Sequence, residues 1–332
     1  MAFSYRTIDG GLHIVDACPA DIGPTMVWPV EVPDGRLILV ATRQDEVRRF
    51  DARTGEAVGD PGRPWPGWAF DFGCAAATVP DGRTIVVGTG DRGISRYDLL
   101  SGEAYPQTAS EKAGTIWAVT TATLPGGRVV VAGAGYDGFV RRWDAATGEQ
   151  IGEPLARHRA ILKAVTTAVS ADGAPMFISG SEMGDVLRWD AATGALVGEP
   201  LPGPVDDAHH LAVARLPGGR QILACVDTYA LHRWDLPSGE PLGPPVRVGK
   251  WAVLVATHVD RHGTPSAFLW FFGVDADGGD RVERWRLDTG EKVDVSLPVT
   301  LRAVFGKRGT WMVLGEFDGS LVARPMPQPV RP

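Results

Sequence analysis

The sequence predicts an all-β fold built from seven repeats of four short antiparallel strands. The first observation is a motif that occurs six times, at Val47–Glu56, Ile94–Glu103, Val140–Glu149, Val186–Ala195, Leu231–Glu240 and Val282–Glu291, with a degraded seventh copy, SLVARPMP, near the C-terminus. The second is the alternation of apolar and polar residues around each copy, interrupted by Gly, Pro and Asp, which is typical of strands joined by hairpins. No amphipathic helix of ten residues is predicted anywhere.

The third repeat shows the four strands in order. Its predicted strands cover residues 117–124, 128–133, 139–144 and 149–155, and the turns PGG, GYDG and AATG lie between them. In the last turn, the pattern Asp-x-x-Thr/Ser-Gly predicts that the Asp accepts hydrogen bonds from the amides that follow it and that the Gly adopts a positive φ. The glycines at this position are Gly55, Gly102, Gly148, Gly194, Gly239 and Gly290.

A single four-stranded sheet cannot bury both of its faces, so the repeats are expected to pack on one another. A radial arrangement leaves few exposed sheet edges and predicts a seven-bladed β-propeller that residues 1–332 form as one domain. Repeat counting leaves Leu12–Val15 without a repeat of their own. We therefore expect this strand to pair with Ser320–Arg324, completing the last blade and closing the propeller.

The repeats resemble those of the WD40 family. The likeness rests on the third-strand pattern V-R-x-W-D with the Thr-Gly that follows, on the P-D-G-R hairpins at Pro33–Arg36 and Pro80–Arg83, and on the repeat period. The resemblance implies a propeller scaffold that binds partners, usually other proteins. The Gly-His pair that opens WD40 repeats is missing apart from a relic at His158, and Arg286 replaces one Asp. The His-Ser-Asp-Trp hydrogen-bond tetrad of that family is therefore not expected throughout.

An arginine precedes the aromatic residue in all six motif copies, at Arg49, Arg96, Arg142, Arg188, Arg233 and Arg284. Strand alternation puts each of these side chains on the same face as the Asp two residues later in the first five copies. This predicts a ladder of arginine-carboxylate pairs between neighbouring blades. An anion-binding ring is the alternative, which we disfavour because the third strand lies away from the central channel.

Composition excludes several function classes. The chain has 332 residues and a net charge of -7, and no run of Lys or Arg exceeds two residues, which disfavours a nucleic-acid partner. No apolar run approaches the roughly 18 residues of a membrane helix, and the N-terminal residues lack the pattern of a secretion signal. We expect a cytoplasmic protein without membrane contact and without a cofactor. The excess of Arg over Lys and the lack of Asn indicate a bacterial source.

Three motifs suggest chemistry, but each has a structural explanation. Two GxGxxG matches, Gly88–Gly93 and Gly133–Gly138, precede strands rather than the helix that a dinucleotide site requires, so we interpret them as hairpins. His258, Asp260 and His262 could share a strand face as metal ligands, but they fall where other repeats have a hairpin. The acidic stretch 275–280 resembles half of a calcium loop and is interpreted as an insertion. No metal site is predicted.

The candidate binding surface is the channel mouth at which the innermost strands begin. Aligning the repeats puts Thr25, Phe72, Trp117, Lys163, His209 and Trp251 at this level, and Trp65, Trp68, Asp207 and His210 nearby. Aromatic and charged side chains on exposed loops are typical of protein interfaces. We predict that Trp65, Trp68, Phe72, Trp117, Lys163, His209, His210 and Trp251 bind a protein partner.

Two alternatives remain for this surface. Trp117 and Trp251 could instead fill the channel or pack between blades. The mouth could also be a small-molecule pocket or an enzyme site, with His209, His210, Asp207 and Lys163 as acid-base groups. No known nucleophile motif supports catalysis, so a non-catalytic scaffold is preferred.

Overall fold

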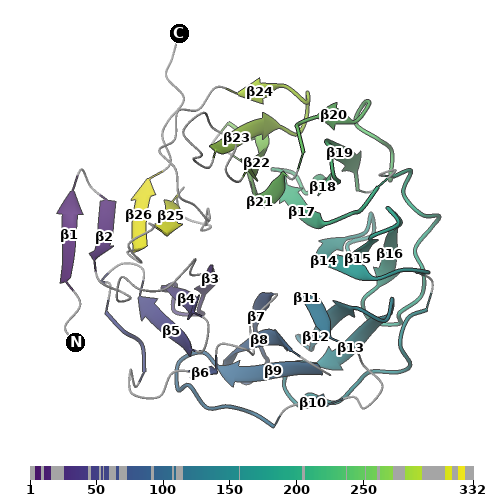
Figure 1. Cartoon of the computed structure of the whole chain (residues 1–332). Helices are drawn as coiled ribbons and strands as arrows, with labels where there is room; N and C mark the ends of the chain where they lie inside the picture. Colours follow the sequence, from purple (N-terminus) through teal and green to yellow (C-terminus); the bar gives the residue numbers. More distant parts are fainter. Residues whose placement is uncertain are drawn as a thin grey trace. The chain divides into compact units, whose positions relative to one another are not determined.

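A computed structural model describes most of the chain. The described residues are 4–8, 11–15, 26–43, 46–51, 54, 56–59, 65–66, 73–90, 93–106, 108–109, 115–156, 158–203, 206–236, 238–250, 252–259, 262–271, 281–293, 311–315 and 321–325. All regular structure in them is β, as predicted, and they contain no helix that could cross a membrane (Figure 1). The chain divides into two compact units, Ala69–Ser296 and a second unit formed by Met1–Trp68 with Leu297–Pro332. The single-domain organisation stays a prediction.

The unit Ala69–Ser296 contains five antiparallel sheets, each made by consecutive strands. The first holds β7 (Cys74–Thr78), β8 (Thr84–Gly90), β9 (Gly93–Asp98) and β10 (Thr108–Ala109). The next two hold β11 (Ile116–Thr123), β12 (Val129–Gly135) and β13 (Val140–Asp144), and then β14 (Leu162–Val169), β15 (Pro175–Ser181) and β16 (Val186–Asp190). The last two hold β17 (His210–Arg215), β18 (Gln221–Val226), β19 (Ala230–Asp235) and β20 (Val246–Arg247), and then β21 (Val253–Val259), β22 (Pro265–Phe271), β23 (Arg281–Arg286) and β24 (Lys292–Val293).

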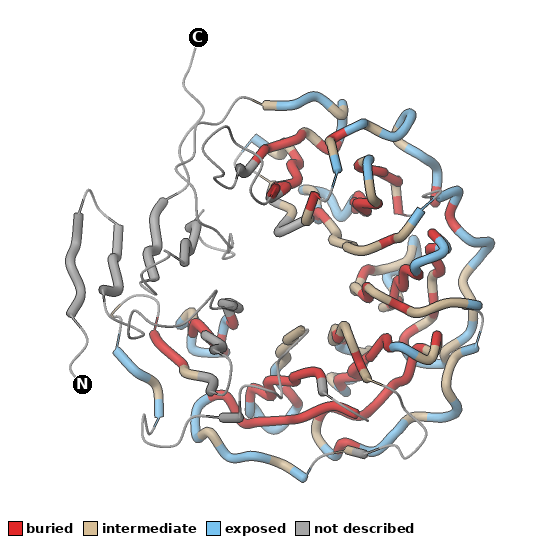
Figure 2. The backbone as a smooth tube through the Cα atoms, viewed as in Figure 1, coloured by how far each residue is buried: buried red, intermediate tan, exposed pale blue. Residues whose placement is uncertain are grey.

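Neighbouring sheets of this unit pack face to face. Their first strands lie side by side in the order β7, β11, β14, β17 and β21 (Figure 1). One apolar cluster joins Val87 of β8 to Val131 and Trp143 of the next sheet, and similar clusters follow between later sheets. The second strands are therefore covered on both faces, which explains why β12 is a continuous apolar run, buried at every position (Figure 2).

Two of these sheets have three strands rather than the predicted four. Isolated bridges, Trp143↔Gln150 and Val140↔Leu155, stand where the fourth strand of the β11–β13 sheet was expected. The β14–β16 sheet has the same pair of bridges one repeat later. Both segments contain a Gly and a Pro, as does the segment before β20, and Pro cannot donate to a strand ladder, so pairing along the third strand is discontinuous in each.

The second unit contains two sheets. One holds β3 (Met26–Glu31), β4 (Leu37–Arg43), β5 (Glu46–Asp51) and β6 (Trp65–Pro66) in that order. The other has the order β1 (Ser4–Ile8), β2 (Gly11–Val15), β26 (Leu321–Pro325) and β25 (Trp311–Gly315). The predicted pairing of the two chain ends is present, with Leu12 opposite Ala323 and Ile14 opposite Leu321. Strand β1, which lies outside β2, was not predicted.

The turn after the third strand has the predicted chemistry. In the β11–β13 sheet, Asp144 Oδ1 accepts hydrogen bonds from the amides of Ala146 (2.9 Å) and Thr147 (3.0 Å). Gly148 adopts a φ of +80°, which glycine tolerates and other residues rarely do. Asp190 and Gly194 repeat this arrangement in the following sheet. The motif therefore encodes a turn, and the Asp is used within its own sheet.

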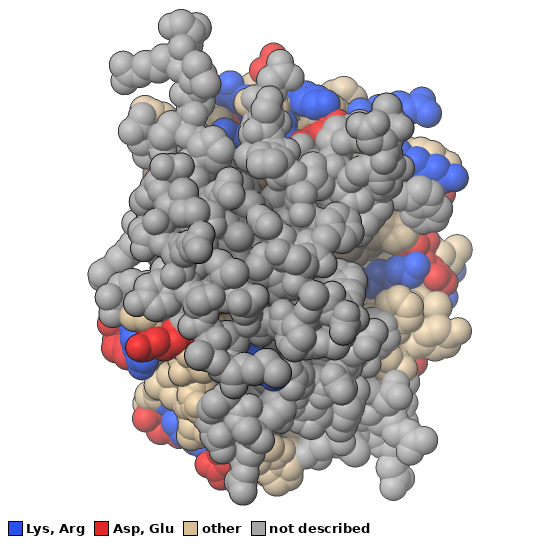
Figure 3. Space-filling view, turned by 60° about the vertical axis from the view of Figure 1, so that its left-hand side comes forward, with Lys and Arg blue, Asp and Glu red and all other residues tan. Residues whose placement is uncertain are grey.

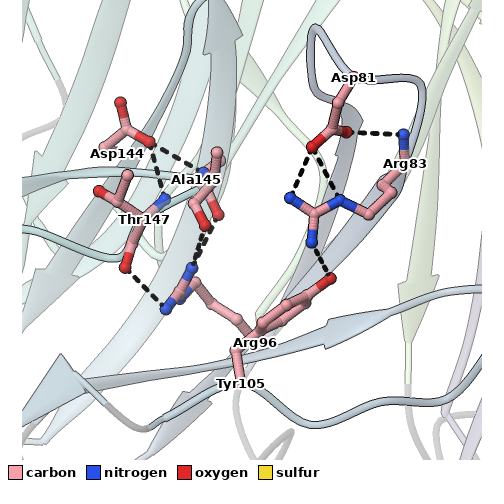
Figure 4. A network of polar contacts seen from close by, with 8 residues as sticks. Asp81, Arg83, Arg96, Tyr105, Asp144, Ala145 and Thr147 are labelled. Carbon is pink, nitrogen blue, oxygen red and sulfur yellow. Dashed lines mark hydrogen bonds and ion pairs between the residues drawn. The ribbon is translucent and has the colours of Figure 1, made fainter.

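The predicted ladder of arginine-carboxylate pairs is wrong. Arg96 instead donates to backbone carbonyls of the next sheet's turn, at Ala145 (3.1 Å), Ala146 (2.9 Å) and Thr147 (3.0 Å), as Figure 4 shows for the labelled residues. Arg142 donates in the same way to Ala191, Ala192 and Thr193. A guanidinium carries donors on several nitrogens and can serve converging carbonyl groups, whereas the Asp carboxylates already accept from their own turns. These contacts join consecutive sheets.

Candidate protein-interaction face

The sheets of Ala69–Ser296 have two edges with different sequences. The hairpins between first and second strands and the turns after third strands lie at one edge, which we call the repeat edge. The opposite edge, which we call the variable edge, has three parts. They are the first residues of the inner strands (β7, β11, β14, β17 and β21), the hairpins between second and third strands, and the loops that lead from one sheet to the next. The register supports this division, because Thr123 pairs with Val129 at the repeat edge and Ile116 with Gly135 at the variable edge.

The repeat edge carries nearly the same polar residues in sheet after sheet. Its hairpins and turns contain Gly, Asp and Arg, which form ion pairs at the surface, either within one turn or between a hairpin and a turn. These pairs are Arg83–Asp81, Arg128–Asp144, Arg220–Asp235 and Arg286–Asp288. Ion pairs of this exposure contribute little to stability, and their recurrence follows from the repeated turn sequence. The repeat edge therefore has a structural explanation.

The inner strands at the variable edge start with different side chains. Trp117 lies where the pairing of β11 with β12 shifts between Ile116 and Ala118, and Lys163 lies at the same shift between Leu162 and Ala164 in the next sheet. Both side chains are half-buried. The alignment of repeats correctly put Trp117 and Lys163 at one level. The same irregularity of the backbone, repeated in two neighbouring sheets, therefore positions an indole in one sheet and an ammonium group in the next.

Lys163, Asp207 and His209 form a polar cluster at this edge. Asp207 Oδ2 lies 2.8 Å from Lys163 Nζ and 3.3 Å from His209 Nδ1, and the three side chains are half-buried. Burial lowers the pKa of His209 below its ordinary value of 6.5, and the Asp207 carboxylate partly opposes that shift. The His209 and His210 rings lie 6.2 Å apart. In this cluster the Asp207 carboxylate neutralises the Lys163 ammonium group, and the polar atoms can hydrogen-bond a ligand or partner group.

Large apolar side chains are exposed in three hairpins of the variable edge. Tyr136 (60% exposed), Met183 (66%) and Tyr229 (41%) each lie between the second and third strands of consecutive sheets. They make up all but one of the exposed large apolar residues in the described part of the chain, the other being Leu100. Sequence reasoning missed them because it treated these segments as turns only. An aromatic residue or Met among Gly and Asp was the signal available.

Each hairpin is fastened to the start of an inner strand or to an inter-sheet loop. The amide of Tyr136 donates to Thr115 (3.0 Å), and the amide of Glu182 donates to Ile161 (3.0 Å). In the following sheet, the amide of Val248 donates to Tyr229 (3.0 Å). These backbone hydrogen bonds fix the backbone positions from which the three exposed side chains project.

Two histidines near the variable edge, the half-buried His158 and the buried His232, contact polar side chains. His158 Nε2 lies 2.6 Å from Ser179 Oγ, which also accepts a hydrogen bond from Trp189 Nε1 (2.8 Å). Burial lowers the pKa of His158 to about 4, so its imidazole is neutral at pH 7. In the next sheet, His232 Nε2 lies 2.8 Å from Asp227 Oδ2.

Some predicted site residues lie elsewhere or outside the described residues. Trp65 is in β6, opposite Val47 at the outer edge of its sheet and not in a loop beside an inner strand, so its predicted position is corrected. Trp65 and Pro66 pair with β5, so strand structure includes residues that were expected to lie in a loop. His210 opens β17 opposite Val226. Trp68, Phe72 and Trp251 lie outside the described residues.

The motifs that suggested other chemistry form hairpins where they are described. Gly90 pairs with Gly93 between β8 and β9, and the second GxGxxG match runs from β12 into the turn before β13. Among the described residues, no group of three His, Cys, Asp or Glu side chains could hold a metal ion. Asp260 and residues 275–280 lie outside them. On the described surface in the view of Figure 3, basic and acidic side chains lie next to one another.

Comparisons with known proteins identify the family. Residues 17–199 match the family described as outer membrane protein assembly factor BamB. No curated protein matches the chain. Among solved structures, the crystal structure of the computationally designed Ika8 protein is similar, with a TM-score of 0.57 and 18% identity over 96% of this chain and 91% of that chain. At this identity, the likeness concerns the fold alone.

The expected WD40 membership is wrong, although both families are propellers. The motif that carried the resemblance encodes a strand and a turn, which several propeller families need. In the described residues, the Trp-Ser-His part of the WD40 network occurs at Trp189, whereas Trp234 Nε1 donates to Pro202 and Trp285 Nε1 donates to Glu283. Since the matched residues cover more than half of its length, the chain belongs to the family described as outer membrane protein assembly factor BamB, a family of PQQ-type propeller repeats.

Proposed function

We propose that the chain is a closed seven-bladed propeller that acts as a non-catalytic protein-interaction scaffold and binds its partner through the variable edge. Membership of a family named for an assembly factor supports a scaffold role. Pairing of β2 with β26, and the contact of β25 with β3 within the same unit, support closure by the two chain ends. The cytoplasmic location expected from the sequence stays a prediction.

The contrast between the two edges carries this proposal. The repeat edge keeps one set of polar residues, whereas the variable edge changes from sheet to sheet and exposes Tyr136, Met183 and Tyr229. Exposed apolar side chains gain free energy when a partner covers them, about 1.5–3 kcal/mol for a fully buried Met or aromatic side chain. Tyr is also enriched among residues that dominate interface energies. Selectivity would therefore come from positions at which the repeats differ.

Site-specific photo-crosslinking tests the proposal. A photoreactive phenylalanine derivative replaces Tyr136 or Tyr229 in one set of variants, and Leu100 at the repeat edge in the control. In cells of the native host, we expect a discrete protein adduct from the first two positions and none from position 100. Equal adducts at all three positions, or none at positions 136 and 229, would overturn the proposal.

A second candidate function is the binding of a small molecule at the Lys163–Asp207–His209 cluster. The convergence of Lys163 Nζ and His209 Nδ1 on one carboxylate oxygen favours it. A panel of metabolites screened by thermal shift would reveal a ligand that stabilises the wild-type protein but not Lys163→Met. Protein crosslinks that persist in Lys163→Met would show that the two functions use separate residues.

A further inference from the structure

We propose that the variable edge binds a basic segment of its partner, in which a Lys or Arg lies next to large apolar side chains. This inference rests on the proposed function, because it names the class of partner for the same face. It follows from the charges around Met183 and from the chemistry of the two exposed tyrosines.

Exposed carboxylates surround Met183. Glu182 and Asp185 lie in the same hairpin, on either side of Met183, and both are exposed. Hydrogen bonds between Ser181 and Asp185 close this turn, so the two carboxylates stay beside the Met side chain. Asp206 is exposed in the loop that leads from this sheet to β17. None of the three carboxylates forms an ion pair with a residue that the structure describes.

Other carboxylates of this edge already have partners. Asp137 lies 2.6 Å from Arg141 Nη1, Asp207 lies 2.8 Å from Lys163 Nζ, and Asp227 pairs with His232. Among the described residues of this edge, the Met183 hairpin therefore holds two neighbouring exposed carboxylates, Glu182 and Asp185, that form no ion pair with another described residue. Exposed cations of the described residues include Arg159 before β14, Arg247 in β20 and Lys250 before β21. A partner cation placed beside Glu182 and Asp185 would meet opposite charge there.

The exposed tyrosines favour the same partner. The face of a Tyr ring attracts a guanidinium or ammonium group. This chain contains such an arrangement at the repeat edge, where the guanidinium carbons of Arg83 and Arg96 lie 5.4 Å and 5.3 Å from the centre of the Tyr105 ring (Figure 4). Tyr136 and Tyr229 offer equivalent rings to an incoming side chain. Met183 adds a flexible apolar surface for the aliphatic part of a Lys or Arg.

Peptide binding to the full chain tests this inference. The probes are two fluorescent peptides of the same length and apolar content, one with Lys and Arg and the other with Glu at the charged positions. The test variant, Glu182→Gln with Asp185→Asn, and the control variant, Glu103→Gln with Glu149→Gln, each remove two exposed carboxylates. The control pair lies next to the turns of the repeat edge. Net charge is thus matched between the variants.

We expect anisotropy to show tighter binding of the basic peptide, a loss of about tenfold in affinity in the test variant, and a change of less than about twofold in the control. Equal binding of the two peptides, or equal affinities of the two variants, would overturn the inference. If the double variant does not fold, Glu182→Gln alone replaces it. We then expect a loss of about threefold in affinity for the basic peptide, and an unchanged affinity would overturn the inference.

The apolar variant Tyr136→Ala with Tyr229→Ala separates this inference from the proposed function. If it loses peptide binding while the charge variant does not, the variable edge is a binding face for another class of partner. If neither variant affects binding of the basic peptide and crosslinking at the edge also fails, the proposed function falls with the inference.

Discussion

Replacing Gly194 with alanine tests whether the guanidinium of Arg142 joins neighbouring sheets. Gly194 adopts a φ of +80°, and an added Cβ would lie 2.7 Å from Arg142 Nη2 and from Leu155 Cδ2. Gly173 provides the matched control, because it has a φ of +83° and nothing within 4 Å of the added Cβ. The unfavourable φ should cost each variant about 1 kcal/mol. Crowding should cost Gly194→Ala a further 1–3 kcal/mol or so.

Loss of the guanidinium provides the second arm of this test. Arg142 is 5% exposed and donates to the carbonyl groups of Ala191 (3.2 Å), Ala192 (2.8 Å) and Thr193 (3.1 Å). Hydrogen bonds from a charged group contribute about 1.5–3 kcal/mol each, but Arg142→Met also removes a buried charge, and water can reach two of the carbonyl groups. We expect a net loss of about 2–4 kcal/mol.

Urea unfolding, followed by Trp fluorescence and far-UV circular dichroism, measures both effects. Coincident transitions are needed to compare free energies of unfolding. In the double variant, the loss in free energy of unfolding should be smaller than the sum of the two single-variant losses, because removing the guanidinium relieves part of the crowding at residue 194. If Gly194→Ala costs no more than Gly173→Ala and the two substitutions are additive, the reasoning is refuted.

Three further predictions concern buried groups and the exposed hairpins. Because burial lowers the pKa of His158 to about 4 from 6.5, the unfolded chain binds a proton more readily between these values. Stability is therefore full above pH 6.5 and falls as the pH drops towards 4, by about 2 kcal/mol between pH 7.5 and 5. Urea unfolding at both pH values should show this loss in the wild type and a smaller one in His158→Gln, whereas equal losses would contradict the assignment. Gly133→Ala should cost about 1–3 kcal/mol, because its Cβ would lie 2.7 Å from Trp143 Cζ3. Gly73→Ala, with its nearest contact at 3.5 Å, is the control for thermal unfolding and should be near neutral. Met183→Ser should change the free energy of unfolding by less than about 0.5 kcal/mol, since the side chain is exposed, and a larger loss would show that Met183 packs in the fold.

The sequence predicted the strands and turns because both depend on residues close together in the chain. Alternation with a period of two located β11, β12 and β13 in the third repeat, and the Asp-x-x-Thr/Ser-Gly pattern located the turn at Asp144. The prediction of a fourth strand failed for two sheets, in which Gly152 and Pro154, or their equivalents, lie in the segment where regular pairing is interrupted. The prediction for the arginines also failed, because alternation gives the face of a strand but not what a long side chain meets on the next sheet.

The binding role of the candidate site stays a prediction, but part of its geometry followed from the sequence. Aligning the repeats put Lys163 and His209 at one level with Asp207 nearby, and in the structure these three side chains lie together. The exposed Tyr136, Met183 and Tyr229 were missed, since turn signals in the same segments concealed them. The family assignment failed because a tryptophan followed by a tight turn satisfies the packing needs of more than one kind of propeller.

Measurement of binding to the purified crosslinked partner tests the central claim most directly. The variant Tyr136→Ser, Met183→Ser and Tyr229→Ser is compared with wild type and with Leu100→Ser at the repeat edge. We predict a loss of affinity of about 100-fold or more in the triple variant, with its unfolding midpoint unchanged, and a change of less than about twofold in Leu100→Ser. Equal affinities of the triple variant and the wild type would contradict the claim that the variable edge is the binding face.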